Sequence, residues 1–208
     1  NNMYNKKNSK LTPPTTYDGY DFKEKLEQAM DCFYNSFLKA EVKPEYNNKK
    51  IFFDINKKHG NFKLPFPERF LHIVSIDDEE KFNVDPCTND IAKEICDNQC
   101  ENESQLAFFR ALKRWECPYR LHRIHWIKEL FKLANNNDKD ITEWDVQEKS
   151  ISGSSKKRLI RYSCGVDDYV IVLREQDKHY NFLTAYPVVS KRKKREFLQR
   201  IFRGKTFG

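Results

Sequence analysis

Two stretches near the end of the chain, Tyr169-Val-Ile-Val-Leu-Arg174 and Tyr180-Asn-Phe-Leu-Thr-Ala-Tyr-Pro-Val-Val189, decide which fold the sequence can form. Both are rich in β-branched and aromatic residues, as strands are. Two earlier stretches, residues 144–148 and 158–163, have the same character. Because the connections are short, and parallel neighbours need crossovers of a dozen residues or more, we expect a four-stranded antiparallel meander.

The segments around these strands have the period of helices. Apolar residues recur every three or four positions over residues 21–40, where Asp21 is a suitable N-cap, and again over residues 119–135. A last helix, residues 191–203, exposes a basic face and buries three apolar side chains: Phe197, Ile201 and Phe202. N-terminal helices followed by a meander sheet and a basic C-terminal helix predict an α+β fold.

The remaining segments suggest where the chain divides. Residues 1–47 read as a flexible lead-in followed by the first helix, with a linker over residues 41–50. Residues 48–208 read as one α+β domain with a hairpin at 51–66 and a short helix that Pro67 opens. Residues 77–103, with ten acids and two lysines, are expected to be an acidic insertion.

Composition excludes several classes of protein. The 208 residues are 38% hydrophobic and 14% aromatic, which is enough for a folded core. No run of 18 apolar residues occurs, so no membrane partner is expected, and the first residues lack the apolar stretch of a secretory signal. Six cysteines are too sparse for a disulfide framework. We therefore expect reduced thiols and a cytoplasmic protein.

Positive charge is concentrated at the end of the chain. Residues 149–208 carry 15 Lys and Arg against 5 Asp and Glu, whereas residues 1–148 carry 23 against 26. Such segregation indicates a polyanionic partner, and the alternative is a solvated lysine-rich tail. The residues expected to bind nucleic acid are Arg120, Arg123, Lys156, Lys157, Arg174, Lys191, Arg192, Lys193, Lys194 and Arg195.

The predicted sheet supplies the side chains for RNA cleavage. The 2′-hydroxyl of RNA is a built-in nucleophile, so an enzyme needs a base, an acid and cations, with no metal or other cofactor. The expected catalytic residues of the sheet are Glu148, Arg158, Arg161, His179, Thr184 and Tyr186. If Leu183 and Ala185 face the core, Thr184 and Tyr186 share the opposite face with Phe182.

The same strands resemble the microbial ribonucleases of the barnase class. The matching stretches are Trp144-Asp-Val-Gln-Glu148, Arg158-Leu-Ile-Arg161-Tyr162 and Asp177-Lys-His179-Tyr-Asn-Phe182. In that class, such strands carry the base, the phosphate clamp and the acid. Here the glutamate follows the tryptophan by four residues rather than two.

A wider stretch, residues 49–203, is similar to phage and prophage toxin nucleases of the barnase, EndoU, colicin and RelE (BECR) superfamily. Four blocks carry this resemblance in order: Phe70-Leu-His72-Ile73, Arg120 with Arg123-Ile-x-Trp126, Tyr169 to Arg174, and Leu183-Thr-Ala-Tyr186. The resemblance implies a toxin-like endoribonuclease that uses 2′-hydroxyl attack, adds His72 to the catalytic residues, and allows an acidic antitoxin or immunity protein as partner.

Three alternatives stay open. Tyr180, Phe182 and Tyr186 could stack bases in a nucleic-acid-binding or toxin-neutralising module that performs no chemistry. A metal-dependent DNA endonuclease is a second alternative, although no acid-x-Lys pair follows an aspartate at a suitable distance. The pairs Cys96 and Cys100, and His122 and His125, have spacings that allow a zinc site, but they equally suit packing residues.

Overall fold

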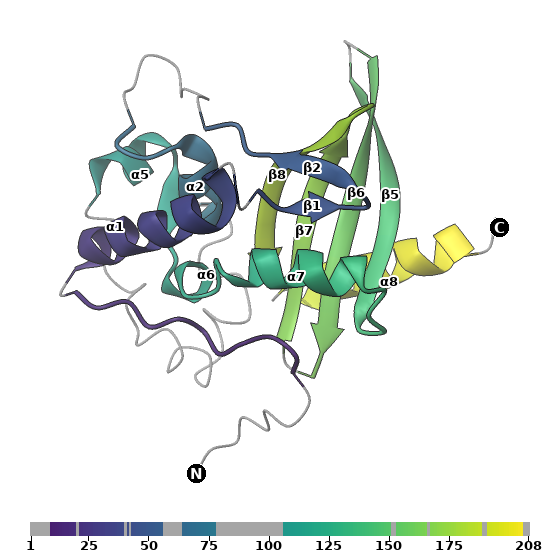
Figure 1. The fold of residues 1–208 in the computed structure, drawn as a ribbon, viewed down its shortest axis with the longest axis horizontal. Coiled ribbons are helices and arrows are strands. Elements are labelled where there is room, and N and C mark those ends of the chain that lie inside the picture. The colour runs from purple at the N-terminus through teal and green to yellow at the C-terminus, as the bar shows by residue number, and fades with distance from the viewer. Residues whose placement is uncertain are drawn as a thin grey trace.

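A mixed sheet organises the fold in the computed structural model (Figure 1). Its six strands are β1 (Glu45–Tyr46), β2 (Lys49–Phe52), β5 (Ile141–Ser150), β6 (Gly153–Cys164), β7 (Asp167–Glu175) and β8 (His179–Pro187). The structure describes residues 9–19, 21–39, 41, 43–55, 64–77, 106–150, 153–165, 167–188 and 191–205, with the backbone alone at 149, 150, 153, 191 and 202–205. The order β1-β2-β8-β7-β6-β5 confirms an α+β fold.

The expectation of a four-stranded antiparallel sheet is wrong. Strands β5 to β8 do pair antiparallel in chain order, but β2 pairs in parallel with β8, and β1 pairs with β2. The added strands are short. β1 and the first half of β2 lie in the segment expected to be a linker, and the second half of β2 lies at the start of the expected hairpin. Asn47 and Asn48 join them with φ angles of 49° and 61°, the left-handed conformation that two-residue hairpin turns require. The hairpin therefore lies at residues 45–52; residues 56–63 of the predicted hairpin lie outside the described residues.

A β-bulge interrupts the pairing of β7 with β8. Val172 is opposite Thr184 while Leu173 is opposite Phe182, so Leu183 is an extra residue in β8. Phe182 and Ala185 consequently both face the larger core, and Leu183 and Tyr186 pack on the opposite face. The expectation that Thr184 and Tyr186 share a face with Phe182 is therefore wrong.

Helices cover one face of the sheet (Figure 1). Helix α1 (Phe22–Phe33) is capped as predicted, because the Asp21 carboxylate accepts a hydrogen bond from the Glu24 backbone N–H at 2.9 Å. It continues into a π-helical turn, η2 (Tyr34–Leu38). Helices α2 (Glu68–Ile73) and α7 (Trp126–Asn135) complete this layer, and their apolar sides join β6, β7 and β8 in the larger core.

The helix predicted over residues 119–135 is interrupted. It consists of α6 (Pro118–Leu121) and α7, with a turn at residues 122–125 between them. The carbonyl of His122 accepts the backbone N–H of Thr15 at 2.8 Å, while the N–H of Trp126 bonds to the carbonyl of Arg123 at 3.1 Å. Contact with a distant segment thus replaces the α-helical bond at this point.

The segment that contacts His122 is itself anchored. Residues 9–16 belong to the predicted flexible lead-in, yet Leu11 is buried in the larger core. The Lys10 ammonium lies 2.6 Å from Asp138 and 2.8 Å from Asp140, and the Trp126 indole N–H donates to the Thr12 carbonyl at 2.8 Å. The described part of this lead-in is therefore bound along α7.

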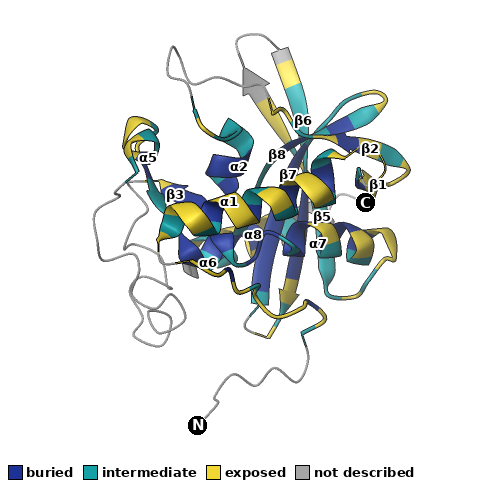
Figure 2. Ribbon diagram, turned by 60° about the vertical axis from the view of Figure 1, so that its left-hand side comes forward, coloured by how far each residue is buried: buried dark blue, intermediate teal, exposed yellow. Residues whose placement is uncertain are grey.

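A second, smaller core lies on the other face of the sheet, under α8 (Lys191–Lys205). Phe197 of α8 packs against Trp144 of β5, with ring centroids 5.2 Å apart, and covers Leu159, Val170 and Val172. Strand β7, in the middle of the sheet, is buried over most of its length by the two layers (Figure 2).

The other elements flank α2. Strands β3 (Ser75–Asp77) and β4 (Arg114–Glu116) form a separate two-stranded sheet, and α5 (Ala107–Ala111) precedes β4. Among the described residues, no disulfide bond joins Cys32, Cys117 or Cys164. None of the helices in the described part of the chain combines the length and apolar character that a membrane span requires.

Candidate active site and nucleic-acid surface

The alternation of the strands separates the expected phosphate clamp from the expected acid. Ile160 and Tyr162 of β6 face the larger core, so Arg158 lies on that side of the sheet. On β8, Tyr180 and Phe182 face the larger core, so His179 lies on the α8 side. Arg158 and His179 therefore cannot act on one phosphate.

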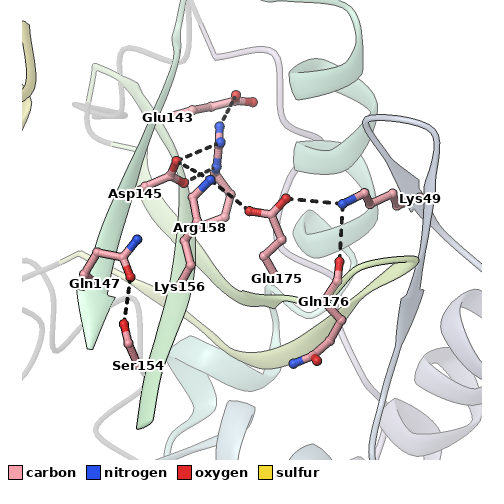
Figure 3. Close-up of polar contacts among 9 residues, drawn as sticks. All are labelled: Lys49, Glu143, Asp145, Gln147, Ser154, Lys156, Arg158, Glu175 and Gln176. Carbon is pink, nitrogen blue, oxygen red and sulfur yellow. Dashed lines mark hydrogen bonds and ion pairs between the residues drawn. The ribbon is translucent and has the colours of Figure 1, made fainter. Parts of the chain in front are cut away.

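Arg158 belongs to a balanced network of charges (Figure 3). Its guanidinium lies 2.6 Å from Asp145 and 3.5 Å from Glu143. The ammonium of Lys156, an expected nucleic-acid ligand, lies 3.0 Å from Asp145 and 2.9 Å from Glu175. The hydrogen bond from Lys156 holds the pKa of the Glu175 carboxyl below its usual range. These pairs join β5, β6 and β7, and they leave neither Arg158 nor Lys156 as an unpaired cation.

Arg161 is also engaged inside the protein. It is 5% exposed, and its Nε and Nη2 atoms donate to the two carboxylate oxygens of Asp168 at 2.8 and 2.6 Å. Its guanidinium lies 5.6 Å from the ring of Phe197, beneath α8. In this structure α8 covers the Arg161 guanidinium, which supports packing between the sheet and α8.

The two arginines expected to bind nucleic acid beside α7 are buried as well. Arg120 is 7% exposed and donates to the Ser75 carbonyl at 2.7 Å. Arg123 is 4% exposed, donates to the Tyr119 carbonyl at 2.8 Å and lies 3.5 Å from the centre of the Tyr119 ring. The break between α6 and α7 turns both side chains inward, so neither forms part of an exposed basic helix face.

Glu148 and His179 share the α8 side of the sheet but lie far apart. They belong to β5 and β8, which β6 and β7 separate, and three strand spacings amount to about 14 Å. Glu148 is exposed, and its carboxylate lies 2.7 Å from the Lys157 ammonium, whose hydrogen bond lowers the pKa of Glu148. The two groups therefore do not form an acid–base pair across one phosphodiester.

The structure does gather other expected residues around the second half of β8. The Tyr186 ring centre lies 5.8 Å from the Arg120 guanidinium and 5.0 Å from the Lys193 ammonium of α8. The Thr184 hydroxyl is buried two residues earlier, and the described residues include no hydrogen-bond partner for it. This part of β8 therefore carries two hydroxyl groups among cations.

Helix α2 lies beside this half of β8 (Figure 1). Arg69 Nη1 donates to the carbonyl oxygen of the bulge residue Leu183 at 2.7 Å. His72 follows Arg69 by three residues, and residues three apart share one face of a helix. His72 thus lies on the same face of α2 as Arg69, whose side chain bonds to β8. We name Arg69, His72, Thr184, Tyr186 and Lys193 the β8 site.

The basic start of α8 adjoins the β8 site. Helix α8 begins beside Tyr186, through Lys193, and crosses the sheet to Trp144, through Phe197. Arg192 and Arg195 are exposed and Lys194 is half-exposed, while the side chain of Lys191 lies outside the described part. The first turn holds no acid. The partial positive charge of the helix start adds to these cations, so an anion bound here would be stabilised.

Sequence reasoning found four of the five members of the β8 site and missed its geometry. Thr184, Tyr186 and His72 were expected to be catalytic, and Lys193 was expected to bind nucleic acid. Arg69 was missed, although it stands only three residues before His72, a spacing that already indicates a shared helix face. No local sequence pattern predicts the bulge at Leu183, whose carbonyl oxygen accepts the hydrogen bond from Arg69.

The two histidines considered for zinc have another role. His122 Nδ1 lies 2.5 Å from the Thr15 carbonyl oxygen, and His125 Nδ1 lies 3.0 Å from the Thr15 hydroxyl. Burial lowers the pKa of His125. Cys96 and Cys100 lie outside the described residues, and among those that are described no three His, Cys, Asp or Glu side chains form a metal-binding group. His122 and His125 anchor the segment around Thr15.

Comparison with protein-family models, curated proteins and solved structures finds no match for this chain.

Proposed function

We propose that this protein is a metal-independent endoribonuclease whose reaction centre is the β8 site. The observation that carries the proposal is that two cations, Arg120 and Lys193, lie within 5.8 and 5.0 Å of the centre of the Tyr186 ring. Beside it stands the face of α2 that carries Arg69 and His72. Cations, hydroxyls and one imidazole are the groups that cleavage by the 2′-hydroxyl needs.

Each residue of the site has a proposed task. Lys193 and the neighbouring cations of α8 hold the phosphate, whose negative charge grows as the 2′-hydroxyl attacks. His72 supplies the imidazole of the site, so it takes the proton of the attacking hydroxyl. The new P–O2′ bond forms as the P–O5′ bond breaks. The products are a 2′,3′-cyclic phosphate and a 5′-hydroxyl, which acquires a proton as it leaves.

His179 is not part of this proposal. It stands at the first residue of β8, and seven residues of strand, or about 23 Å, separate it from Tyr186. Arg120 has a positioning role, since it is buried and bound to the Ser75 carbonyl. An RNA substrate makes the cytoplasm the expected compartment, and the cations of α8 would also suit an acidic antitoxin or immunity protein.

The test compares two histidine variants with RNA in the presence of EDTA. We expect His72→Ala to lose about 10²-fold or more in cleavage rate, the range typical of one general acid–base group. His179→Ala is the matched control, and its rate should stay within a few-fold of the parent. His72→Ala should fold normally, because alanine favours helices and the buried side chains of α2 are Phe70, Leu71 and Ile73.

Two other results would overturn the proposal. Parental cleavage by His72→Ala would remove the imidazole from the mechanism, and cleavage abolished by EDTA would indicate a metal-dependent nuclease. Binding without cleavage would favour a nucleic-acid-binding module. That second candidate is supported by the dispersal of Arg158, Arg161, Glu148 and His179.

A further inference from the structure

The α8 side of the sheet continues past the area that α8 covers. On β6 and β7 the smaller core ends at Leu159 and Val172. The next residues facing this side form one row across four strands. We name this the Phe52 row; its members are Phe52 of β2, Asn181 of β8, Arg174 of β7 and Lys157 of β6. Neighbouring members of the row are paired in the sheet: Phe52 is opposite Asn181, Asn181 is opposite Arg174, and Arg174 is opposite Lys157.

Phe52 offers an exposed ring at one end of the row. Phe52 is 43% exposed, although Ile51, the residue before it in β2, is fully buried. The Lys43 ammonium lies 5.1 Å from the centre of its ring, and the His179 ring lies edge-on at 4.8 Å. The exposed ring of Phe52 can stack on a flat base, and the nearby Lys43 ammonium can attract the negative charge of a phosphate.

Arg174 supplies the charge at the centre of the row. Its Nε atom is buried, and no hydrogen-bond partner for it exists among the described residues. Lys157, by contrast, is paired with Glu148 at 2.7 Å. The Arg174 side chain as a whole is only half-buried, so a phosphate oxygen can approach its guanidinium from solvent.

We propose that the Phe52 row binds single-stranded RNA, with an unpaired base stacked on Phe52 and an adjacent phosphate held by Arg174. This inference rests on the proposed function and extends it, since it names unpaired RNA as the substrate. Asn181 lies between the two and can hydrogen-bond a base edge through its amide. Duplex RNA does not fit, because its bases are already stacked and paired.

The row and the β8 site lie on the same side of the sheet. Tyr186 and Asn181 are five residues apart on β8, or about 16 Å, and both face the α8 side. One RNA strand can therefore follow β8 from Phe52 to the basic start of α8.

The test measures binding separately from cleavage. The probe is a short 2′-O-methyl RNA that contains 2-aminopurine, because its blocked 2′-oxygen cannot attack and stacking quenches its fluorescence. We expect quenching by the parent protein and a loss of affinity of about 5- to 150-fold in Phe52→Ala, the range for one base–aromatic stack. Tyr34→Ala is the matched control: Tyr34 is 49% exposed on η2, and its variant should bind within two-fold of the parent.

A second variant tests the phosphate contact. Arg174→Gln should bind less tightly, and its log–log dependence on salt should be shallower by about 0.7. The inference is overturned if Phe52→Ala and Tyr34→Ala bind alike, or if a duplex of the same sequence competes as well as the single strand. Because the probe cannot be cleaved, inactive His72→Ala should still bind it, so failure of the catalytic proposal and failure of this inference give different results.

Discussion

Arg161 provides a direct test of whether a residue supports the fold or the chemistry. It and Asp168 have side chains only 6% exposed and share two hydrogen bonds. Arg161→Met leaves the Asp168 charge buried without its partner, a loss that typically costs about 3–5 kcal/mol. For a chain of 208 residues, each kcal/mol lowers Tm by about 2–4 °C. The expected decrease in Tm is therefore about 6–20 °C.

Calorimetry on three variants measures this effect. Arg161→Met combined with Asp168→Leu should recover most of the lost stability, because an apolar pair no longer buries an uncompensated charge. Arg200→Met is the matched control, since Arg200 forms an exposed pair with Glu196 on α8 at 2.8 Å, worth about 0.3–0.5 kcal/mol. RNA cleavage by Arg161→Met, measured well below its Tm, should stay within a few-fold of the parent. A parental Tm together with a loss of cleavage of about 10²-fold would refute the structural role of Arg161.

The pH dependence of stability and the salt dependence of binding are two further tests. Burial lowers the pKa of His125, and the charge of Arg123 lowers it further while that of Glu129 opposes the shift. In the unfolded chain the histidine pKa is about 6.5, so the unfolded chain binds the proton at a higher pH than the folded protein does. The free energy of unfolding should therefore decrease below about pH 6.5. Between pH 7.5 and 5.5 the Tm of His125→Gln should decrease by less than the Tm of the parent, and equal decreases would contradict this. Replacing the four described cations at the start of α8 with glutamine should make the log–log salt slope of single-stranded RNA binding shallower by up to about 2.8, at about 0.7 per contact. An unchanged slope would show that α8 does not touch RNA. These cations are Arg192, Lys193, Lys194 and Arg195.

The positions of the main elements followed from local patterns. Strand periodicity predicted residues 169–174 and 180–189, which form most of β7 and β8, and helical periodicity with Asp21 predicted the start of α1. These predictions succeeded because hydrophobic spacing and capping act between residues a few positions apart. The same approach missed β1 and the first half of β2, because strands of two and four residues are too short for a period to show.

The candidate site was only partly accessible from local patterns. The types of residue that RNA cleavage needs could be recognised. Thr184 and Tyr186 lie on β8 with Lys193 beside Tyr186, and His72 lies on α2, which contacts β8. Which cations are available could not be inferred, because the partners of Arg158 and Arg161 lie on neighbouring strands. The pairing Arg161–Asp168 spans the β6–β7 turn, and the contact of Arg120 with Ser75 joins residues 45 positions apart.

By itself, the sequence determined the order of α1, the strands β5 to β8 and α8, the concentration of positive charge after residue 148, and the amphipathic character of α1 and α8. Only the tertiary structure decided which face of the sheet each polar residue occupies. One extra residue at Leu183 reverses the alternation along β8, and β2 places Phe52 beside Asn181 from 129 positions away. The physical reason is that periodicity depends on neighbours in the chain, whereas strand register and charge pairing depend on segments that meet only when the sheet closes.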